Sequence, residues 1–401
     1  MSTDTPLHLA VALDGAGWHP AAWREASAQP GDLLDPSYWV GLVQTAEAGL
    51  LDFVTLEDSL ALQSSRNNTH DQRTDLVRGR LDSVMVAARV APLTEHIGLI
   101  PSVTVTHTEP FHLSKAIATL DYVSQGRAGV RVQVSGRPQE AAHFGRRQWE
   151  GRPAEEISRK LFAEAGDYVE VMRRLWDSWE DDAEIRDVAT GRFVDREKLH
   201  YIDFNGRWFN VKGPSITPRP PQGQPVVAAL AHSSVPYRFA AEQADIVLAT
   251  PTDPAGAGVI IEEVRRYQRE AGRPDAAVVI LADLVVFLGA TQQQAEDRKT
   301  RMDDRFGHPY RSDAPIFTGT PAALAQLIGE WKDAGIQGFR LRPAGLPVDL
   351  DLIVSDVVPE LQRRSLFRTA YGPGTLRDRM GWGRPANRYA QGANVGPKAT
   401  A

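Results

Sequence analysis

The chain has 401 residues, a formal net charge of −6, and 42% hydrophobic and 24% charged residues. These values are ordinary for a soluble globular protein, and the interspersed charges indicate neither a nucleic-acid partner nor an acidic membrane surface. Because cysteine is absent, disulfides, thiolate catalysis, zinc–thiolate sites and iron–sulfur clusters are excluded. No metal-ligand spacing, signal peptide or membrane-length apolar run is recognisable, so a cytoplasmic location is expected.

The first part of the chain alternates apolar and amphipathic segments. The run Leu7–Leu13 predicts a strand, and Ser37–Gly49 predicts a helix whose apolar residues share one face. A second strand at Phe53–Leu56 and a second helix at Arg80–Val90 repeat this order. The alternation is typical of an α/β fold with a parallel sheet.

The stretch 96–135 predicts one strand–helix–strand unit. Residues 97–105 are β-branched or apolar with small breaks, as in a strand that is buried on both faces of a parallel sheet. Pro110 suits the first turn of a helix, and Gly126 lies in the corner that ends it. The next strand is expected at Ala128–Val134.

The second half of the chain continues the alternation. A long helix is expected at Ala154–Trp179. The remaining strands are expected at Pro225–Leu230, Ile246–Ala249, Val278–Leu288 and Gly338–Leu341. Eight strands alternating with helices predict a TIM-type (β/α)8 barrel, with residues 1–369 as a single domain.

Three segments depart from the barrel pattern. Segments 181–223 and about 291–318 are longer than ordinary loops, and such excursions are typical of lids and binding loops. Segment 370–401 is expected to be an extended C-terminal arm. Its aromatic and leucine residues predict packing on the barrel or on a neighbouring subunit, so a homodimer or homotetramer is expected.

Several sequence blocks resemble the luciferase-like flavin-dependent monooxygenases. They are IATLDYVSQGRAG at 117–129, LWDSWEDDA at 175–183, GPSITPRPPQGQPV at 213–226 and VVPELQRRSLFRTAYGPGTLRDRMG at 357–381. The resemblance spans nearly the whole chain. The most similar subgroup contains nitrilotriacetate, dibenzothiophene-sulfone and long-chain alkane monooxygenases.

Position along the strands selects the candidate site residues, because a (β/α) barrel builds its active site at the C-terminal strand ends. The candidates are His19, Asp58, Ser102, His107, Arg131, Ser135, Ser233 and Ser234. His19, His107 and Arg131 are the candidate catalytic residues. The alternatives are a solvated loop histidine for His19, a packing residue for His107 and a cap for Asp58.

The resemblance implies cofactor contacts for the other candidates. Asp58 and Ser102 would lie at the flavin ring and Ser135 near it. Ser233, with Ser234, would hold the FMN phosphate at a helix N-terminus, whose free N–H groups favour an anion.

The chain also departs from the family pattern. Arg131 replaces an asparagine, Ala229 and Pro236 alter the phosphate loop, and segment 158–162 lacks the family's histidine and tyrosine.

Arg131 is the largest of these departures. Strand alternation directs its side chain into the barrel, where a guanidinium requires a partner. The expected partner is the carboxylate of Asp58 or Glu57, an anionic reduced flavin or an acidic substrate.

The resemblance implies a two-component monooxygenase. It would use O2 and reduced FMN, supplied by a separate flavin reductase, to oxygenate a small organic substrate. One alternative is a deazaflavin-dependent hydride-transfer oxidoreductase, since cofactor identity does not follow from a fold. The other is a non-catalytic luciferase-like partner subunit with weakened flavin binding.

Overall fold

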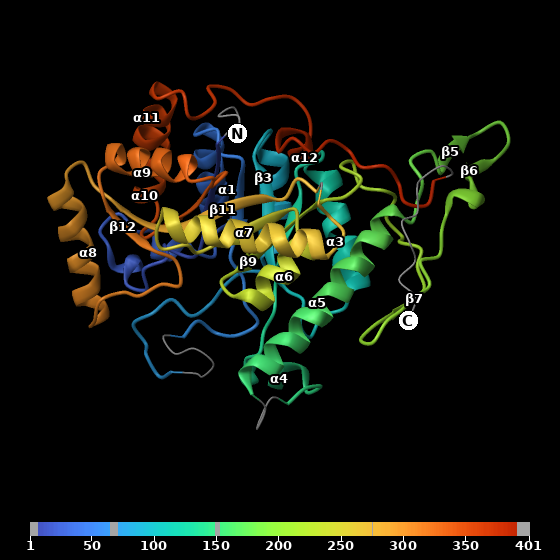
Figure 1. The fold of residues 1–401 in the computed structure, drawn as a ribbon, viewed down its shortest axis with the longest axis horizontal. Helices are drawn as coiled ribbons and strands as arrows, with labels where there is room; N and C mark the ends of the chain where they lie inside the picture. Colours follow the sequence, from blue (N-terminus) through green and yellow to red (C-terminus); the bar gives the residue numbers. More distant parts are fainter. Residues whose placement is uncertain (1–6, 65–70, 149–152, 275, 391–401) are drawn as a thin grey trace.

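Eight parallel strands close into a barrel surrounded by helices (Figure 1). The structure is a computed structural model that describes residues 7–64, 71–148, 153–274 and 276–390. The strand order is β1, β2, β3, β4, β9, β10, β11, β13, and the pairing of β1 with β13 closes the ring. The expected TIM-type (β/α)8 barrel is therefore confirmed.

The barrel strands lie close to the apolar segments expected from the sequence. They are β1 (His8–Leu13), β2 (Phe53–Leu56), β3 (Gly98–Thr104), β4 (Gly129–Gln133), β9 (Val226–Ala231), β10 (Ile246–Ala249), β11 (Val279–Leu288) and β13 (Gly338–Pro343). Alternate side chains face the barrel interior and the outer helices. Both faces are covered, which explains why the strands are apolar along most of their length.

Helices pack around the outside of the barrel. They are α1 (Pro36–Ala48), α2 (Ser83–Val90), α3 (Pro110–Val123), α5 (Ala154–Asp177), α6 (Ser234–Gln243), α7 (Pro254–Glu270), α9 (Pro321–Asp333), α10 (Val348–Leu352) and α11 (Val358–Arg363). Helix α2 begins three residues later than expected, because Asp82 caps it by accepting a hydrogen bond from the Met85 N–H at 2.9 Å. No described helix is long and apolar enough to cross a membrane.

The two long excursions have structure of their own. Segment 181–223 forms two short hairpins, β5 (Glu184–Asp187) with β6 (Arg192–Val194) and β7 (Phe204–Asn205) with β8 (Asn210–Val211), and the first projects from the barrel (Figure 1). The second excursion holds α8 (Gln292–Phe306) and β12 (Ile316–Gly319). Strand β12 pairs with the last four residues of β11, beyond those that pair with β10. Strand β11 thus extends past the barrel rim.

The C-terminal arm packs against the base of the barrel. Its short helix α12 (Leu376–Arg379) places the fully buried Leu376 in one apolar cluster with Phe53 and Ile100 inside the barrel. A Cβ atom built on Gly98 would lie 2.9 Å from the Leu376 methyl groups, so the glycine makes room for this leucine. Residues 391–401 of the expected arm lie outside the described residues.

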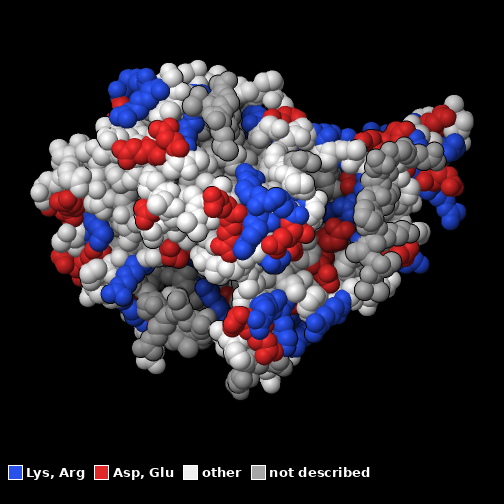
Figure 2. Space-filling model, in the orientation of Figure 1, with Lys and Arg blue, Asp and Glu red and all other residues white. Residues whose placement is uncertain are grey.

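Surface charge follows the composition. On the face shown in Figure 2, Lys and Arg side chains lie among Asp and Glu side chains over α5, α6 and α7, without a continuous basic area. Within the described residues, no group of three or more His, Asp or Glu side chains is placed to hold a metal ion.

Candidate functional site

The barrel interior is apolar toward the arm and charged toward the C-terminal strand ends. Strand alternation turns five buried charged side chains inward, and four of them lie on β4, β11 and β13 while one directly follows β2. They are Arg131, Glu57, Arg340, Asp283 and Arg342, and we call this set the charge ladder. None of the five side chains is more than 8% exposed.

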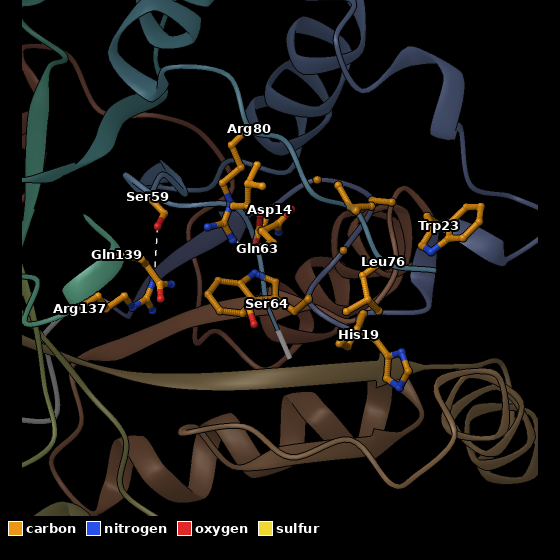
Figure 3. Close-up of a pocket in the computed structure, with 17 residues that line it drawn as sticks. Asp14, His19, Trp23, Ser59, Gln63, Ser64, Leu76, Arg80, Arg137 and Gln139 are labelled. Carbon is orange, nitrogen blue, oxygen red and sulfur yellow. Dashed lines mark hydrogen bonds and ion pairs between the residues drawn. The ribbon is translucent and has the colours of Figure 1, made fainter. Parts of the chain in front are cut away.

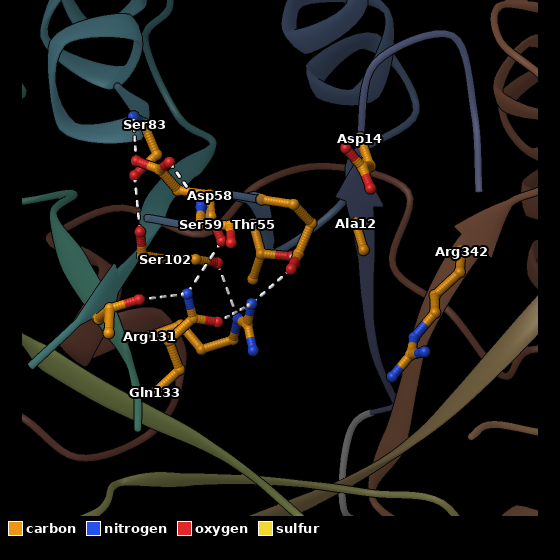
Figure 4. A network of polar contacts seen from close by, with 12 residues as sticks. Ala12, Asp14, Thr55, Asp58, Ser59, Ser83, Ser102, Arg131, Gln133 and Arg342 are labelled. Carbon is orange, nitrogen blue, oxygen red and sulfur yellow. Dashed lines mark hydrogen bonds and ion pairs between the residues drawn. The ribbon is translucent and has the colours of Figure 1, made fainter. Parts of the chain in front are cut away.

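Each member of the charge ladder contacts the next one. Arg131 pairs with Glu57, and Arg340 donates to Glu57 Oε1 at 3.2 Å. Arg340 Nε also donates to Asp283 Oδ1 at 2.8 Å, and Arg342 Nε donates to Asp283 Oδ2 at 2.9 Å. Of the two carboxylates expected to hold Arg131, Glu57 is therefore the partner. Figure 4 shows this region around Arg131.

The carboxylates of the charge ladder are ionised at neutral pH. Burial alone would raise the pKa of Glu57 and of Asp283, but the neighbouring arginines outweigh burial and hold both pKa values below their usual range. For Arg131 the balance is opposite, since burial lowers its pKa more than Glu57 raises it. A guanidinium nevertheless remains charged at neutral pH.

A cavity of about 420 Å³ lies at the mouth of the barrel, and we call it the mouth cavity. The three ladder arginines line it, together with Trp18 after β1 and Ser135 after β4. A second cavity of about 200 Å³ shares part of this lining and extends along the loop after β1 (Figure 3). The residues common to both cavities are Asp14, Trp18, Ser59, Arg80 and Arg137.

The structure brings Asp58, Arg131 and Ser135 together at the mouth cavity. Asp58 is committed to the backbone, because its carboxylate accepts from the N–H groups of Ser59 at 2.6 Å and Ser83 at 3.0 Å. This matches the cap interpretation, and burial raises the Asp58 pKa. Ser102 is fully buried beside Arg131, whose Nε donates to its hydroxyl at 2.8 Å.

His19 lines the second cavity and not the mouth cavity, and His107 lines neither of the two. His19 is buried, and its Nδ1 accepts from the Ala21 N–H at 3.0 Å, so Nε2 carries the proton and faces Asp303 at 3.1 Å. Burial lowers the pKa of His19 and keeps the ring neutral. His107 is stacked on Phe144 with ring centroids 5.1 Å apart, and within the described residues neither of its buried ring nitrogens has a hydrogen-bond partner.

Ser233 and Ser234 lie at the N-terminus of α6. Ser233 is the N-cap residue, but its exposed side chain caps no backbone N–H group. Ser234 instead donates to Glu263 at 2.8 Å. The start of α6 lies near the mouth cavity, because Leu230 at the end of β9 lines the cavity and His232 interacts electrostatically with Asp313 on its rim.

A family model described as luciferase-like monooxygenase matches residues 16–316. The chain belongs to this family. It is 30% identical to nitrilotriacetate monooxygenase component A of Aminobacter aminovorans, across 98% of this chain and 100% of that protein. It is 29% identical to N-acetyl-S-(2-succino)cysteine monooxygenase of Bacillus subtilis strain 168, across 96% and 98% of the two chains.

Solved structures share the fold of this luciferase-like monooxygenase. Long-chain alkane monooxygenase (LadA) superimposes with a TM-score of 0.83 at 24% identity, covering 94% of this chain and 96% of that one. An F420-dependent secondary alcohol dehydrogenase gives a TM-score of only 0.63 at 15% identity, covering 88% and 99%. Family membership and the relatives together confirm a flavin-dependent monooxygenase over the two alternatives.

The residues at the mouth of this luciferase-like monooxygenase fit a reduced flavin. The ladder arginines place positive charge at the cavity floor, which suits a ring that is anionic when reduced. The uncommitted Ser233 hydroxyl and the first N–H groups of α6 suit a phosphate, although Pro236 supplies no N–H. Despite the departures at Arg131 and in the phosphate loop, the site therefore has hydrogen-bond donors both for the reduced flavin ring and for the phosphate.

Two functional features escaped the sequence interpretation although the strand pattern carried a signal for them. Asp283 interrupts ten otherwise apolar residues in β11, and Arg340 and Arg342 alternate with Phe339 and Leu341 in β13. A period of two predicts that these charged side chains share the interior face of the barrel. Asp313 carries no such signal, because it lies in the loop between α8 and β12.

Proposed function

We propose that this flavin-dependent monooxygenase receives reduced FMN from a separate flavin reductase and oxygenates a small organic substrate in the mouth cavity. The three ladder arginines that line the cavity carry the proposal, because their N–H groups can donate to the anionic reduced cofactor more strongly than to the neutral oxidised one. Two relatives that match this chain along nearly their whole length are named as monooxygenases, which supports the reaction class.

The chain's own residues would bind and orient the cofactor. Arg131 and Ser135 would hold the ring, and Ser233 would hold the phosphate. When bound, reduced FMN supplies the electrons for oxygen activation. Trp18 forms part of the wall that limits the access of water. Asp58 fixes the start of α2 at the cavity edge by accepting a hydrogen bond from the Ser83 N–H.

Cofactor titration tests the proposal. Reduced FMN is expected to bind the wild-type protein more tightly than oxidised FMN or a reduced deazaflavin. Arg131→Met should weaken binding of reduced FMN by about tenfold, equivalent to about 1.4 kcal/mol, and affect oxidised FMN less. Arg159→Met, which removes a 60% exposed arginine on α5, is the matched control. If Arg131→Met left the affinity for both redox forms unchanged, the arginine would serve only to fill the barrel.

We also propose a cytoplasmic homodimer or homotetramer built from single-domain barrels. An apolar cavity of about 320 Å³ on the surface of α1 and α2 includes Met85, whose exposed fraction is 67%. The β5–β6 hairpin exposes Val188 at 94% and Phe193 at 61%. Such apolar exposure is typical of protein interfaces. Light scattering at micromolar concentration tests the assembly, and a monomer would refute it.

A further inference from the structure

Among the described residues, Asp313 is the partly exposed carboxylate that contacts the charge ladder, with 43% of its side chain exposed. Arg342 presents two edges to two acids. Its Nε and Nη2 face Asp283, while its Nη1 donates to Asp313 Oδ1 at 2.6 Å and its Nη2 to Asp313 Oδ2 at 3.2 Å. The second contact is the two-point geometry with which a guanidinium recognises a carboxylate. We propose that Arg342 and Trp18 form a subsite for a substrate carboxylate, and that Asp313 occupies this subsite until the substrate displaces it.

The charge balance of the ladder supports the proposal. Within the ladder itself, three arginines pair with two buried carboxylates, Glu57 and Asp283, so the ladder alone carries one excess positive charge. Asp313 supplies the missing negative charge from the rim. If Asp313 moved away, the buried arginines would require another anion, because uncompensated buried charge is strongly unfavourable. An anionic substrate provides one.

Of the two carboxylates that contact Arg342, Asp313 is the one that can move into water more easily. Its side chain is 43% exposed, whereas the Asp283 side chain is fully buried. Burial alone would raise the pKa of Asp313, but its bonds to Arg342 hold the pKa well below the usual range, so it competes as an anion. Because Arg342 is 1% exposed, it keeps a carboxylate partner throughout, and an incoming carboxylate can take the place of Asp313 by making the same two-point contact.

The surroundings of Arg342 are arranged for a small organic acid. The guanidinium lies 4.4 Å from the centre of the Trp18 ring, and the indole N–H donates to the Ala12 carbonyl at 2.8 Å. The stacked ring holds the guanidinium plane and leaves its edge toward the rim. Arg342, Trp18 and Asp313 all line the mouth cavity, and Leu230 adds an apolar contact in the same lining.

The loop that carries Asp313 is anchored at Tyr310, away from the contact between Asp313 and Arg342. Tyr310 donates its backbone N–H to Asp303 at 2.8 Å, and its ring lies 5.0 Å from the ring of His19. Near the rim, Ser312 Oγ donates to Asp313 Oδ1 at 3.2 Å. The Asp313 side chain can therefore leave Arg342 without detaching Tyr310. This assigns a positioning role to His19, which holds the base of the loop.

Binding of glutarate and of its neutral diamide, glutaramide, tests the subsite by calorimetry with and without bound FMN. Wild-type protein should bind glutarate and not glutaramide. Asp313→Asn should tighten glutarate binding by about tenfold, because it removes the competing carboxylate and leaves the Asp283 pair in place. Asp313→Glu should resemble the wild type.

Asp75→Asn is the matched control. Asp75 forms a comparable two-point pair with Arg73 and has a 41% exposed side chain, but it is absent from the lining of the mouth cavity. This variant should leave glutarate affinity unchanged. Equal affinities of wild type, Asp313→Asn and Asp75→Asn for glutarate, in both the presence and the absence of FMN, would overturn the proposal. So would equal binding of glutarate and glutaramide.

The subsite rests on the proposed function in one respect, since the mouth cavity is taken as the substrate site. The two can fail separately. Loss of glutarate binding alongside normal binding of reduced FMN would remove the carboxylate subsite and leave the monooxygenase proposal intact. The opposite result is glutarate binding that responds to Asp313→Asn in a protein that fails to bind reduced FMN. It would keep the carboxylate subsite and remove the monooxygenase proposal.

Discussion

Two substitutions in the charge ladder should differ in their effect on stability, although they break the same ion pair. Glu57→Gln removes the carboxylate that Arg131 and Arg340 share. Arg131→Met removes one of the two arginines that Glu57 contacts. After Arg131→Met the buried ladder holds two arginines and two carboxylates. After Glu57→Gln it holds three arginines and Asp283 alone.

The expected magnitudes follow from this difference. Glu57→Gln leaves Arg131 with neutral acceptors alone, namely the new amide oxygen and the side chains of Ser102 and Gln133 at 2.8 and 3.2 Å. Leaving a buried charge without its partner destabilises a protein by about 3–5 kcal/mol. Arg131→Met leaves every remaining charge paired and fills the volume with an apolar chain, so the loss should be about 1–2 kcal/mol.

Urea unfolding at pH 7 followed by circular dichroism measures the difference, and its pH dependence gives a second check. The pKa of Glu57 is lower in the folded protein than its usual 4.5. A carboxylate with a depressed folded pKa stabilises the fold above its unfolded pKa, and this stabilisation is lost as the pH falls toward the folded value. The loss caused by Glu57→Gln should thus shrink below about pH 4.5. The reasoning would be refuted if Arg131→Met lowered the free energy of unfolding at pH 7 by as much as Glu57→Gln, or by more.

Three further predictions concern the fold. Leu376→Ala should lower the free energy of unfolding by about 2–5 kcal/mol in chemical denaturation, whereas Leu34→Ala, at a 68% exposed side chain, should have little effect. Asp82→Ala should lower the melting temperature, because losing the α2 cap removes about 1 kcal/mol, and Asp82→Asn should retain most of it. The wild-type melting temperature should fall below about pH 6.5 as the buried, neutral His19 is forced to protonate; a His19→Gln variant with the same pH profile would contradict this.

The strand pattern predicted more of the site than the motifs did. Alternation along β4 was sufficient to turn Arg131 into the barrel and to require an anionic partner, and of the partners expected, Glu57 is the one that the structure shows. The same argument applied to β11 and β13 would have found Asp283, Arg340 and Arg342. Strand periodicity is local, so it can be read without knowledge of the tertiary structure.

Residues whose roles depend on long-range contacts could not be placed in this way. Position after the first strand suggested an active-site role for His19, which lines the second cavity, but its contact with Asp303 on α8 joins residues far apart in the chain and has no local signal. Leu376 likewise gives no local sign that it packs among residues of the barrel base. Asp313 reaches Arg342 only because β12 pairs with β11 and brings the preceding loop over the barrel mouth.

The two halves of the barrel interior therefore serve different purposes. Toward the arm, Leu376 completes an apolar cluster whose burial stabilises the fold. Toward the mouth, buried ion pairs occupy space that apolar side chains of similar volume could fill with equal or greater stability. Because a (β/α) barrel carries out chemistry at this end, stability alone does not account for the charge ladder. The double variant Glu57→Leu with Arg131→Met should accordingly fold about as well as the wild type and bind reduced FMN poorly.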